Sequence, residues 1–149
     1  MSFALSSPAF SASGEIPTEH TCDGQDIAPH LIWSGAPKGT RSFVLIMDDP
    51  DAPHGTFTHW IVFDIPGDRT DLPSGARSDA IGISGRNGGH ALGYMGPCPP
   101  SGTHRYFFRL SALDVASLGL AAGASRDRVE AAMAAHMIGT AELMGRYRR

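Results

Sequence analysis

Five polar residues in three segments of the chain have the chemistry to bind a small anion. The first two, Asp49 and Asp51, lie in the segment Asp48-Asp49-Pro50-Asp51-Ala52-Pro53, directly after an apolar run. Because they are two positions apart, an extended backbone directs both carboxylates to the same side. The two prolines restrict the turn, and a cis bond is one way to hold it. A solvated acidic turn with local hydrogen bonds gives the same pattern.

The third residue, His59, interrupts the otherwise apolar run Phe57–Ile65. In a strand, His59 shares its face with Phe57, Ile61 and Phe63. A hydrogen-bonded core histidine is the simpler interpretation. Near a carboxylate the imidazole would hold its proton longer, which raises its pKa and suits it to bind phosphate or carboxylate.

The segment from Gly93 to Tyr106 carries the strongest signal. Its glycines allow a ligand to approach the backbone closely, and its prolines stiffen the loop, so we predict a preformed oxyanion cradle. The loop leads into a strand on which His104 and Tyr106 share a face, with Arg105 on the other side. An ordinary Gly/Pro turn before a core strand is the alternative.

Short runs bounded by Gly, Pro, Asp or Ser predict a chain rich in strands. The predicted strands are Leu31–Trp33, Ser42–Asp48, Phe57–Ile65 and Arg105–Leu113. The run Phe57–Ile65 is apolar on both faces, which indicates burial on both sides. We assign the long polar stretch Asp68–Gly89 to the rim of the site.

One helix is predicted near the end of the chain, with Ser125 as its N-cap and Asp127 in its first turn. Its apolar face comprises Val129, Ala132, Met133, His136 and Met137. Periodicity leaves Ala141–Tyr147 open, as a further helical turn or a closing strand.

Composition limits the classes of function. The 149 residues are 42% hydrophobic, enough for a single domain over residues 1–149. A formal net charge of -3 argues against nucleic acid as a partner. We find no signal peptide and no run long enough to span a membrane, and so expect a cytoplasmic protein. Cys22 and Cys98 form no CxxC motif, so we expect two reduced thiols.

The motifs together resemble the phosphatidylethanolamine-binding protein (PEBP) family, in its bacterial, Raf kinase inhibitor-like branch. The resemblance covers nearly the whole chain: Phe10, Thr21–Gly24, Leu31–Trp33, Asp49–Pro53, His59-Trp60 and the Gly-Pro-x-Pro-Pro-x-Gly-x-His-Arg-Tyr segment that ends at Tyr106. His30 departs from it, because bacterial relatives commonly have Pro-Pro there. The resemblance implies a mainly β fold, a Greek-key β-sandwich with a large sheet packed on a smaller one and one or two short C-terminal helices.

The resemblance also implies a pocket for phosphate-like head groups and other anions. Its residues correspond by motif to Asp49, Asp51, His59, Gly93, Gly96, Pro97, His104 and Tyr106. It also implies a homodimer. We expect neither a cofactor nor a metal. Cys98 lies in the same loop, where we expect an inert packed thiol.

We therefore predict a binding protein and not an enzyme, with a small anionic or zwitterionic ligand such as phosphate or phosphoethanolamine. In this interpretation Asp49 and Asp51 orient and charge the histidines, or meet the amine of a zwitterion. The alternative is a small hydrolase or metal-dependent enzyme that uses the same His/Asp pocket, although the chain has no HExxH or G-x-S-x-G motif. Inhibition of a kinase or protease, with the protein partner unknown, rests on family analogy alone.

Overall fold

The computed structural model describes residues 2–149, and most of its regular structure is strand. The strands are β1 (Ala4–Ser6), β2 (Leu31–Ser34), β3 (Ser42–Asp49), β4 (Phe57–Pro66), β5 (Asp71–Leu72), β6 (Ile83–Ser84), β7 (Thr103–Leu113) and β8 (Met137–Arg148). The helical segments are a 3-10 turn (Thr18–His20), α1 (Ser78–Ile81) and α2 (Arg126–Met133). Within this range no helix is long and apolar enough to cross a membrane.

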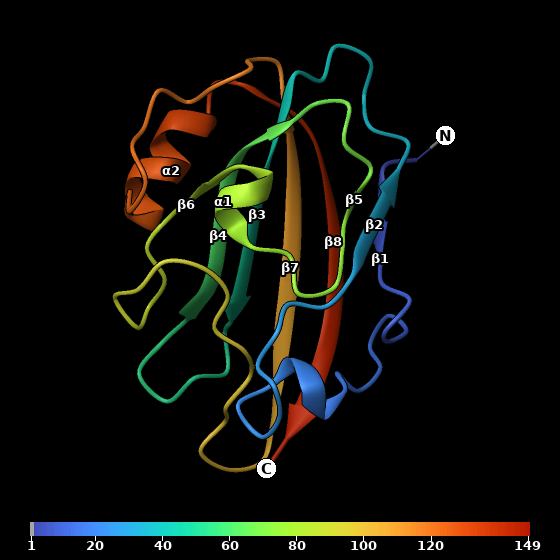
Figure 1. The fold of residues 1–149 in the computed structure, drawn as a ribbon, viewed down its shortest axis with the longest axis vertical. Coiled ribbons are helices and arrows are strands. Elements are labelled where there is room, and N and C mark those ends of the chain that lie inside the picture. The colour runs from blue at the N-terminus through green and yellow to red at the C-terminus, as the bar shows by residue number, and fades with distance from the viewer. Residues whose placement is uncertain (1) are drawn as a thin grey trace.

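The strands form two antiparallel sheets, a large one in the order β6-β4-β3-β7-β8 and a small one in the order β1-β2-β5 (Figure 1). After a long connection, β7 returns to pair with β3 on the side opposite β4. The spatial order β7-β3-β4-β6 is that of a Greek key. The predicted mainly β, Greek-key sandwich with a short C-terminal helix is therefore confirmed.

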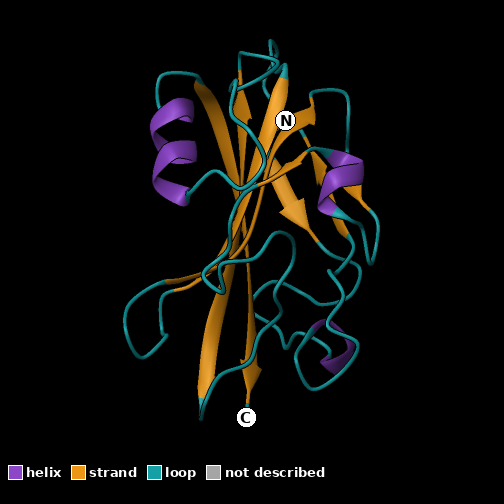
Figure 2. Ribbon diagram, turned by 60° about the vertical axis from the view of Figure 1, so that its left-hand side comes forward, coloured by secondary structure: helices purple, strands orange, loops and turns teal. Residues whose placement is uncertain are grey.

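Each face of the large sheet has its own hydrophobic core. Successive side chains of β3 alternate between the two, because a strand directs neighbours to opposite sides. Phe43, Leu45 and Met47 face the small sheet, whereas Val44 and Ile46 face α2. Figure 2 shows α2 and α1 on opposite sides of the long strands. All eight residues of β3 are buried, so this central strand fixes the frame of the site.

All four predicted strands are present, and β4 is buried on both faces as expected. The open segment Ala141–Tyr147 belongs to β8, which pairs with β7 along nearly its whole length. Alternate residues of this segment, such as Leu143 and Tyr147, are buried. This period-two pattern is that of a strand covered on one face.

The predicted helix begins correctly but ends earlier than expected. The Ser125 hydroxyl accepts a hydrogen bond from the Arg128 N–H (3.3 Å), and Val129 and Met133 are buried against the large sheet. The helix stops at Met133, so the placement of His136 and Met137 on its apolar face is wrong. Met137 already belongs to β8, because pairing with β7 outweighs the helical pattern at this point.

The expectation of two reduced thiols is also wrong. Cys22 and Cys98 form a disulfide across 76 residues, with their Cα atoms 5.4 Å apart. Two hydrogen bonds hold the loops together: the Cys22 N–H donates to the Pro97 carbonyl (3.1 Å), and the Tyr94 hydroxyl donates to the His20 carbonyl (2.7 Å). Separation along the chain says little about such proximity, which depends on how the loops fold back.

We expect the free energy of unfolding of the double variant Cys22→Ser, Cys98→Ser to be about 4 kcal/mol lower than that of the oxidised wild type. The disulfide closes a long loop, and its loss restores conformational entropy to the unfolded chain. Urea denaturation followed by tryptophan fluorescence measures this difference. Wild type in strong reductant is the control and should approach the variant. Equal stability of oxidised wild type and variant would contradict the prediction.

Candidate functional site

A pocket of about 170 Å³ lies among residues of β3, β4 and β7, the turn after β3, and the loop that precedes β7. It is lined by Asp49, Ala52, Pro53, Phe57, His59, Met95, Gly96, Cys98, Pro99, Pro100, His104 and Tyr106. Drug-sized ligands occupy pockets of roughly 300–1,000 Å³, so this one suits a much smaller group. Apolar walls around a few polar groups are typical of small-molecule sites.

Asp49 and His104 form a buried, hydrogen-bonded pair in this pocket. The Asp49 Oδ2 lies 2.7 Å from His104 Nδ1, and both side chains are at least nine-tenths buried. An ionised carboxylate only accepts, so Nδ1 carries the donated proton. The other ring nitrogen of His104 forms no hydrogen bond within residues 2–149. His104 therefore has a fixed orientation and one nitrogen left for a ligand.

Asp51 has a different environment from the one its spacing predicts. Its N–H donates to Asp49 Oδ1 (2.8 Å), which is the local acidic turn of the alternative interpretation. Its carboxylate accepts two hydrogen bonds from the Arg105 guanidinium and one from the Arg105 N–H, each 2.9 Å. These hydrogen bonds lower the pKa of Asp51 to about 2. Asp51 thus pairs with Arg105 beside the pocket and does not line it, and no peptide bond between residues 2 and 149 is cis.

His59 lies on the other side of the strand from the one predicted, because β4 contains a bulge. On β3, Asp48 pairs with Thr58 and its neighbour Met47 pairs with Trp60. His59, between Thr58 and Trp60, therefore has no partner on β3 and is the extra residue of the bulge. Its ring packs edge-on against Tyr106 (5.3 Å between centroids), whereas Ile61 and Phe63 face α2. The bulge thereby directs the imidazole into the pocket.

The pKa of His59 is lowered, not raised as expected. Burial is the largest cause and outweighs the Met95 hydrogen bond and the attraction of Asp49 and Asp26. His59 Nδ1 lies 2.6 Å from the Met95 carbonyl, which can only accept, so this nitrogen carries the proton of the neutral ring. At neutral pH the remaining nitrogen is thus an acceptor, which becomes a donor when the ring is protonated.

Tyr106 lies between the two histidines and holds a hydroxyl without a partner. The residue is fully buried, and its hydroxyl forms no hydrogen bond within the described residues. Its ring is stacked at 6.5 Å from that of His104. Burial is the main cause that raises the pKa of Tyr106 far above the physiological range, and the nearby Asp49 carboxylate adds to it, both as a charge and as an acceptor close to the hydroxyl. The hydroxyl therefore remains a hydrogen-bond donor.

The other predicted residues are distributed around the pocket. Gly96 lines it, Pro97 is buried behind it, and Gly93 lines a separate cavity. The stretch Asp68–Gly89, expected at the rim, contains β5, α1 and β6, and none of its residues lines this pocket. A run too long for a plain connection therefore contains short elements of its own.

Sequence reasoning missed the apolar lining. The sequence pattern could have identified Phe57, because it lies two positions before His59 in a predicted strand. In the structure its ring contacts that of His59 (4.9 Å between centroids). Met95, Pro99 and Pro100 belong to the Gly/Pro loop but carry no polar signal. Within residues 2–149 no three His, Cys, Asp or Glu side chains are arranged to hold a metal ion.

Comparison with known proteins gives the family. The model of the phosphatidylethanolamine-binding protein family matches residues 6–148. The chain is 50% identical over 149 residues to a UPF0098 protein of Methanothermobacter thermautotrophicus, covering 97% of this chain and 98% of that one. It is 51% identical over 148 residues to a UPF0098 protein of Aquifex aeolicus, covering 96% and 86%. The chain therefore belongs to the phosphatidylethanolamine-binding protein family.

Two solved structures agree with this assignment. CT736 of Chlamydia trachomatis, crystallised as a homolog of phosphatidylethanolamine-binding proteins, superposes with a TM-score of 0.94 and 39% identity, over 99% of this chain and 98% of that one. YbcL of Escherichia coli, described as a new member of the mammalian family, superposes with a TM-score of 0.92 and 32% identity, over 100% and 99%. The relatives include archaeal proteins, so the bacterial branch stays a prediction.

We expect Tyr106→Phe to leave the free energy of unfolding unchanged or to raise it by up to about 1 kcal/mol. The substitution removes a buried hydroxyl that has no hydrogen-bond partner and keeps the ring. Urea denaturation measures the change. The comparison variant is Tyr94→Phe, which removes a hydroxyl bonded to the His20 carbonyl and should lose about 1 kcal/mol. A loss for Tyr106→Phe as large as that for Tyr94→Phe would show that its hydroxyl is satisfied in the folded protein.

Proposed function

We propose that this protein binds a small anion or phosphorylated head group in the pocket formed by Asp49, His59, His104 and Tyr106. The observation that carries the proposal is the Tyr106 hydroxyl, a buried donor without a partner between two imidazoles. Buried polar groups are nearly always hydrogen-bonded, and in a pocket a bound water, ion or ligand can supply the missing partner. An oxyanion is the partner that suits a phenol and two protonatable rings best.

The two carboxylates do not oppose an anion as strongly as their number indicates. Asp49 is paired with His104, and Asp51 with Arg105. The Arg105 guanidinium compensates the charge of Asp51, and the Asp49 carboxylate is already hydrogen-bonded to His104. Since Arg105 already binds the Asp51 carboxylate, a ligand amine is not required, and phosphate alone should bind.

Proton uptake accompanies binding in this proposal. In the neutral His59 ring the free nitrogen is an acceptor, and an anion needs a donor there. Since burial lowers the pKa of His59 in the free protein, a bound anion raises it and draws in a proton. The contribution of His59 to the affinity therefore increases as the pH falls, by the linkage between proton and ligand.

We expect saturable binding of inorganic phosphate that is at least several-fold tighter at pH 6 than at pH 8. Isothermal titration calorimetry in two buffers of different ionisation enthalpy gives the protons taken up. Tyr106→Phe should weaken binding about tenfold or more, the worth of one hydrogen bond to a charged group. Phosphoethanolamine and a phosphotyrosine analogue, titrated in parallel, show whether the pocket prefers an amine or accepts an aromatic ester.

His54→Gln is the matched control, because His54 is an exposed histidine close to the site in sequence that does not line the pocket. It should bind phosphate as wild type does. Absence of saturable binding at either pH, or equal binding by Tyr106→Phe and wild type, would overturn the proposal. A heat signal that appears only after zinc is added would favour the metal-dependent alternative.

Three further expectations stay predictions: a homodimer, inhibition of a kinase or protease, and a cytoplasmic location. The Cys22–Cys98 disulfide bears on the last of these. Disulfides persist in oxidising compartments, whereas the cytoplasm of most organisms keeps thiols reduced.

We expect Cys22 and Cys98 to resist alkylation in acid-quenched cells unless a reductant is added first, because the two sulfurs are bonded. Mass spectrometry of the intact protein counts the alkyl groups. The same sample reduced before alkylation is the control and should gain two. Two alkyl groups without prior reduction would instead support the cytoplasmic location.

A further inference from the structure

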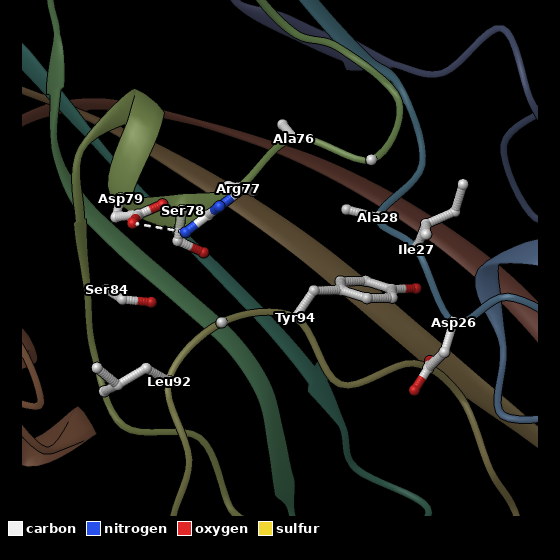
Figure 3. A pocket seen from close by; sticks show the side chains of 12 residues that line it. Asp26, Ile27, Ala28, Ala76, Arg77, Ser78, Asp79, Ser84, Leu92 and Tyr94 are labelled. Carbon is white, nitrogen blue, oxygen red and sulfur yellow. Dashed lines mark hydrogen bonds and ion pairs between the residues drawn. The ribbon is translucent and has the colours of Figure 1, made fainter.

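A second pocket, of about 390 Å³, is separate from the site described above. Figure 3 shows its walls: the segment Asp26–Ala28, the segment Gly75–Asp79 that leads into α1, Ser84 of β6, and the loop residues Leu92–Tyr94. It shares no lining residue with the first pocket. Gly75–Asp79 and Ser84, which belong to the stretch expected at the rim of the first pocket, line this second pocket instead.

The pocket contains a buried hydroxyl without a partner. Ser84 is 6% exposed, and its Oγ forms no hydrogen bond within residues 2–149. Its side chain points into the pocket in Figure 3. Close by, the Ser78 hydroxyl accepts a hydrogen bond from Trp60 Nε1 (2.8 Å) and keeps its own proton to donate. One end of the pocket thus offers two hydroxyl groups to a ligand.

The other end carries a carboxylate without a cation. Asp26 Oδ1 accepts the Gly96 N–H (2.9 Å), and within the described residues Asp26 forms no ion pair with Lys, Arg or His. The other carboxylate of the pocket, Asp79, is paired with Arg77 (3.2 Å). Asp26 and Ser84 lie at opposite ends of the view in Figure 3. The unbalanced charge of the pocket is therefore negative and located at Asp26.

Between these ends the walls are apolar. The Tyr94 ring is held by its hydroxyl on the His20 carbonyl and packs at 88° on Trp60, 5.3 Å between centroids. Ile27, Ala28 and Leu92 supply aliphatic surface. Apolar surface with a few polar groups at defined positions is the usual form of a small-molecule site.

We infer that this pocket binds a small organic amine, with its ammonium group at Asp26, its apolar frame along Tyr94, and a hydroxyl or other polar group at Ser84. This binding is independent of the anion site. The two pockets nevertheless share a wall at one point, because the Gly96 N–H bound by Asp26 belongs to a residue that lines the first pocket. A Cβ at Gly96 would lie 2.2 Å from Asp26 Oδ1, so the contact is as close as the backbone permits.

The test uses three related probes: tyramine, which has both polar groups, phenethylamine, which lacks the hydroxyl, and tyrosol, which lacks the amine. Each is titrated into ¹⁵N-labelled protein at pH 7. The indole N–H signal of Trp60 reports on the pocket through Ser78, and that of Trp33, the other tryptophan, is the internal control. We expect tyramine to shift the Trp60 signal saturably, with a Kd on the order of 1 mM.

Two variants separate the ends of the pocket. Asp26→Asn keeps an acceptor for the Gly96 N–H. It should weaken the binding of tyramine about fivefold, as expected for loss of an exposed ion pair, and leave the affinity for tyrosol unchanged. Ser84→Ala should weaken the binding of tyramine by a similar factor and leave the affinity for phenethylamine unchanged. Its affinity for phosphate should equal that of wild type. Asp68→Asn, an exposed carboxylate that lines neither pocket, is the matched control and should bind all three probes normally.

Four results would overturn the inference. They are no saturable shift of the Trp60 signal, an equal shift of the Trp33 signal, wild-type affinity of Asp26→Asn for tyramine, or displacement of tyramine by phosphate. The last result would place the probe in the anion pocket. Because the first three results are obtained without phosphate, the inference can fail or succeed whatever the outcome for the anion site.

Discussion

The buried carboxylate of Asp49 links the parts that form the anion pocket. One oxygen accepts from His104 at the start of β7, and the other accepts from the N–H of Asp51 in the turn after β3. A buried charge is tolerated only when it is paired and hydrogen-bonded, so this side chain fixes both the ring of His104 and the course of the turn. The preceding residue, Asp48, faces the opposite side of the sheet, where it pairs with Arg109 (2.7 Å) and Arg126 (2.8 Å) and so connects α2 to the sheet.

The bulge in β4 directs the side chains of His59 and Trp60 to the same face of the large sheet. In a regular strand His59 and Trp60 would point to opposite sides. The extra residue in β4 removes this alternation, so Trp60 is part of the core between the sheets while His59 reaches Tyr106 in the pocket. In this position the imidazole is buried, and burial lowers its pKa in spite of the nearby carboxylates.

The loop from Gly93 to Cys98 separates two pockets with different chemistry. On one side Met95, Gly96 and Cys98 line the pocket with the two histidines, and on the other Gly93 and Tyr94 line the pocket with the unpaired carboxylate of Asp26. The loop is held by the Cys22–Cys98 disulfide, the Asp26–Gly96 hydrogen bond and the Tyr94–His20 hydrogen bond. All three connect it to the segment His20–Asp26. This segment therefore determines where the shared wall lies.

The sequence by itself determined the sandwich and the types of residue in the pocket. Alternation and turn residues identified four strands, because each strand is defined by its own local sequence, whereas the sandwich and the set of pocket residues were indicated by the resemblance of separate motifs to one family. Only the tertiary structure decided the end of α2, the role of β8, the disulfide, the pairing of Asp51 with Arg105 and the direction of His59. Each of these depends on a partner far away in the chain or on one residue inserted into a strand. Local periodicity contains no information about distant partners, and a single bulge reverses the face that it predicts.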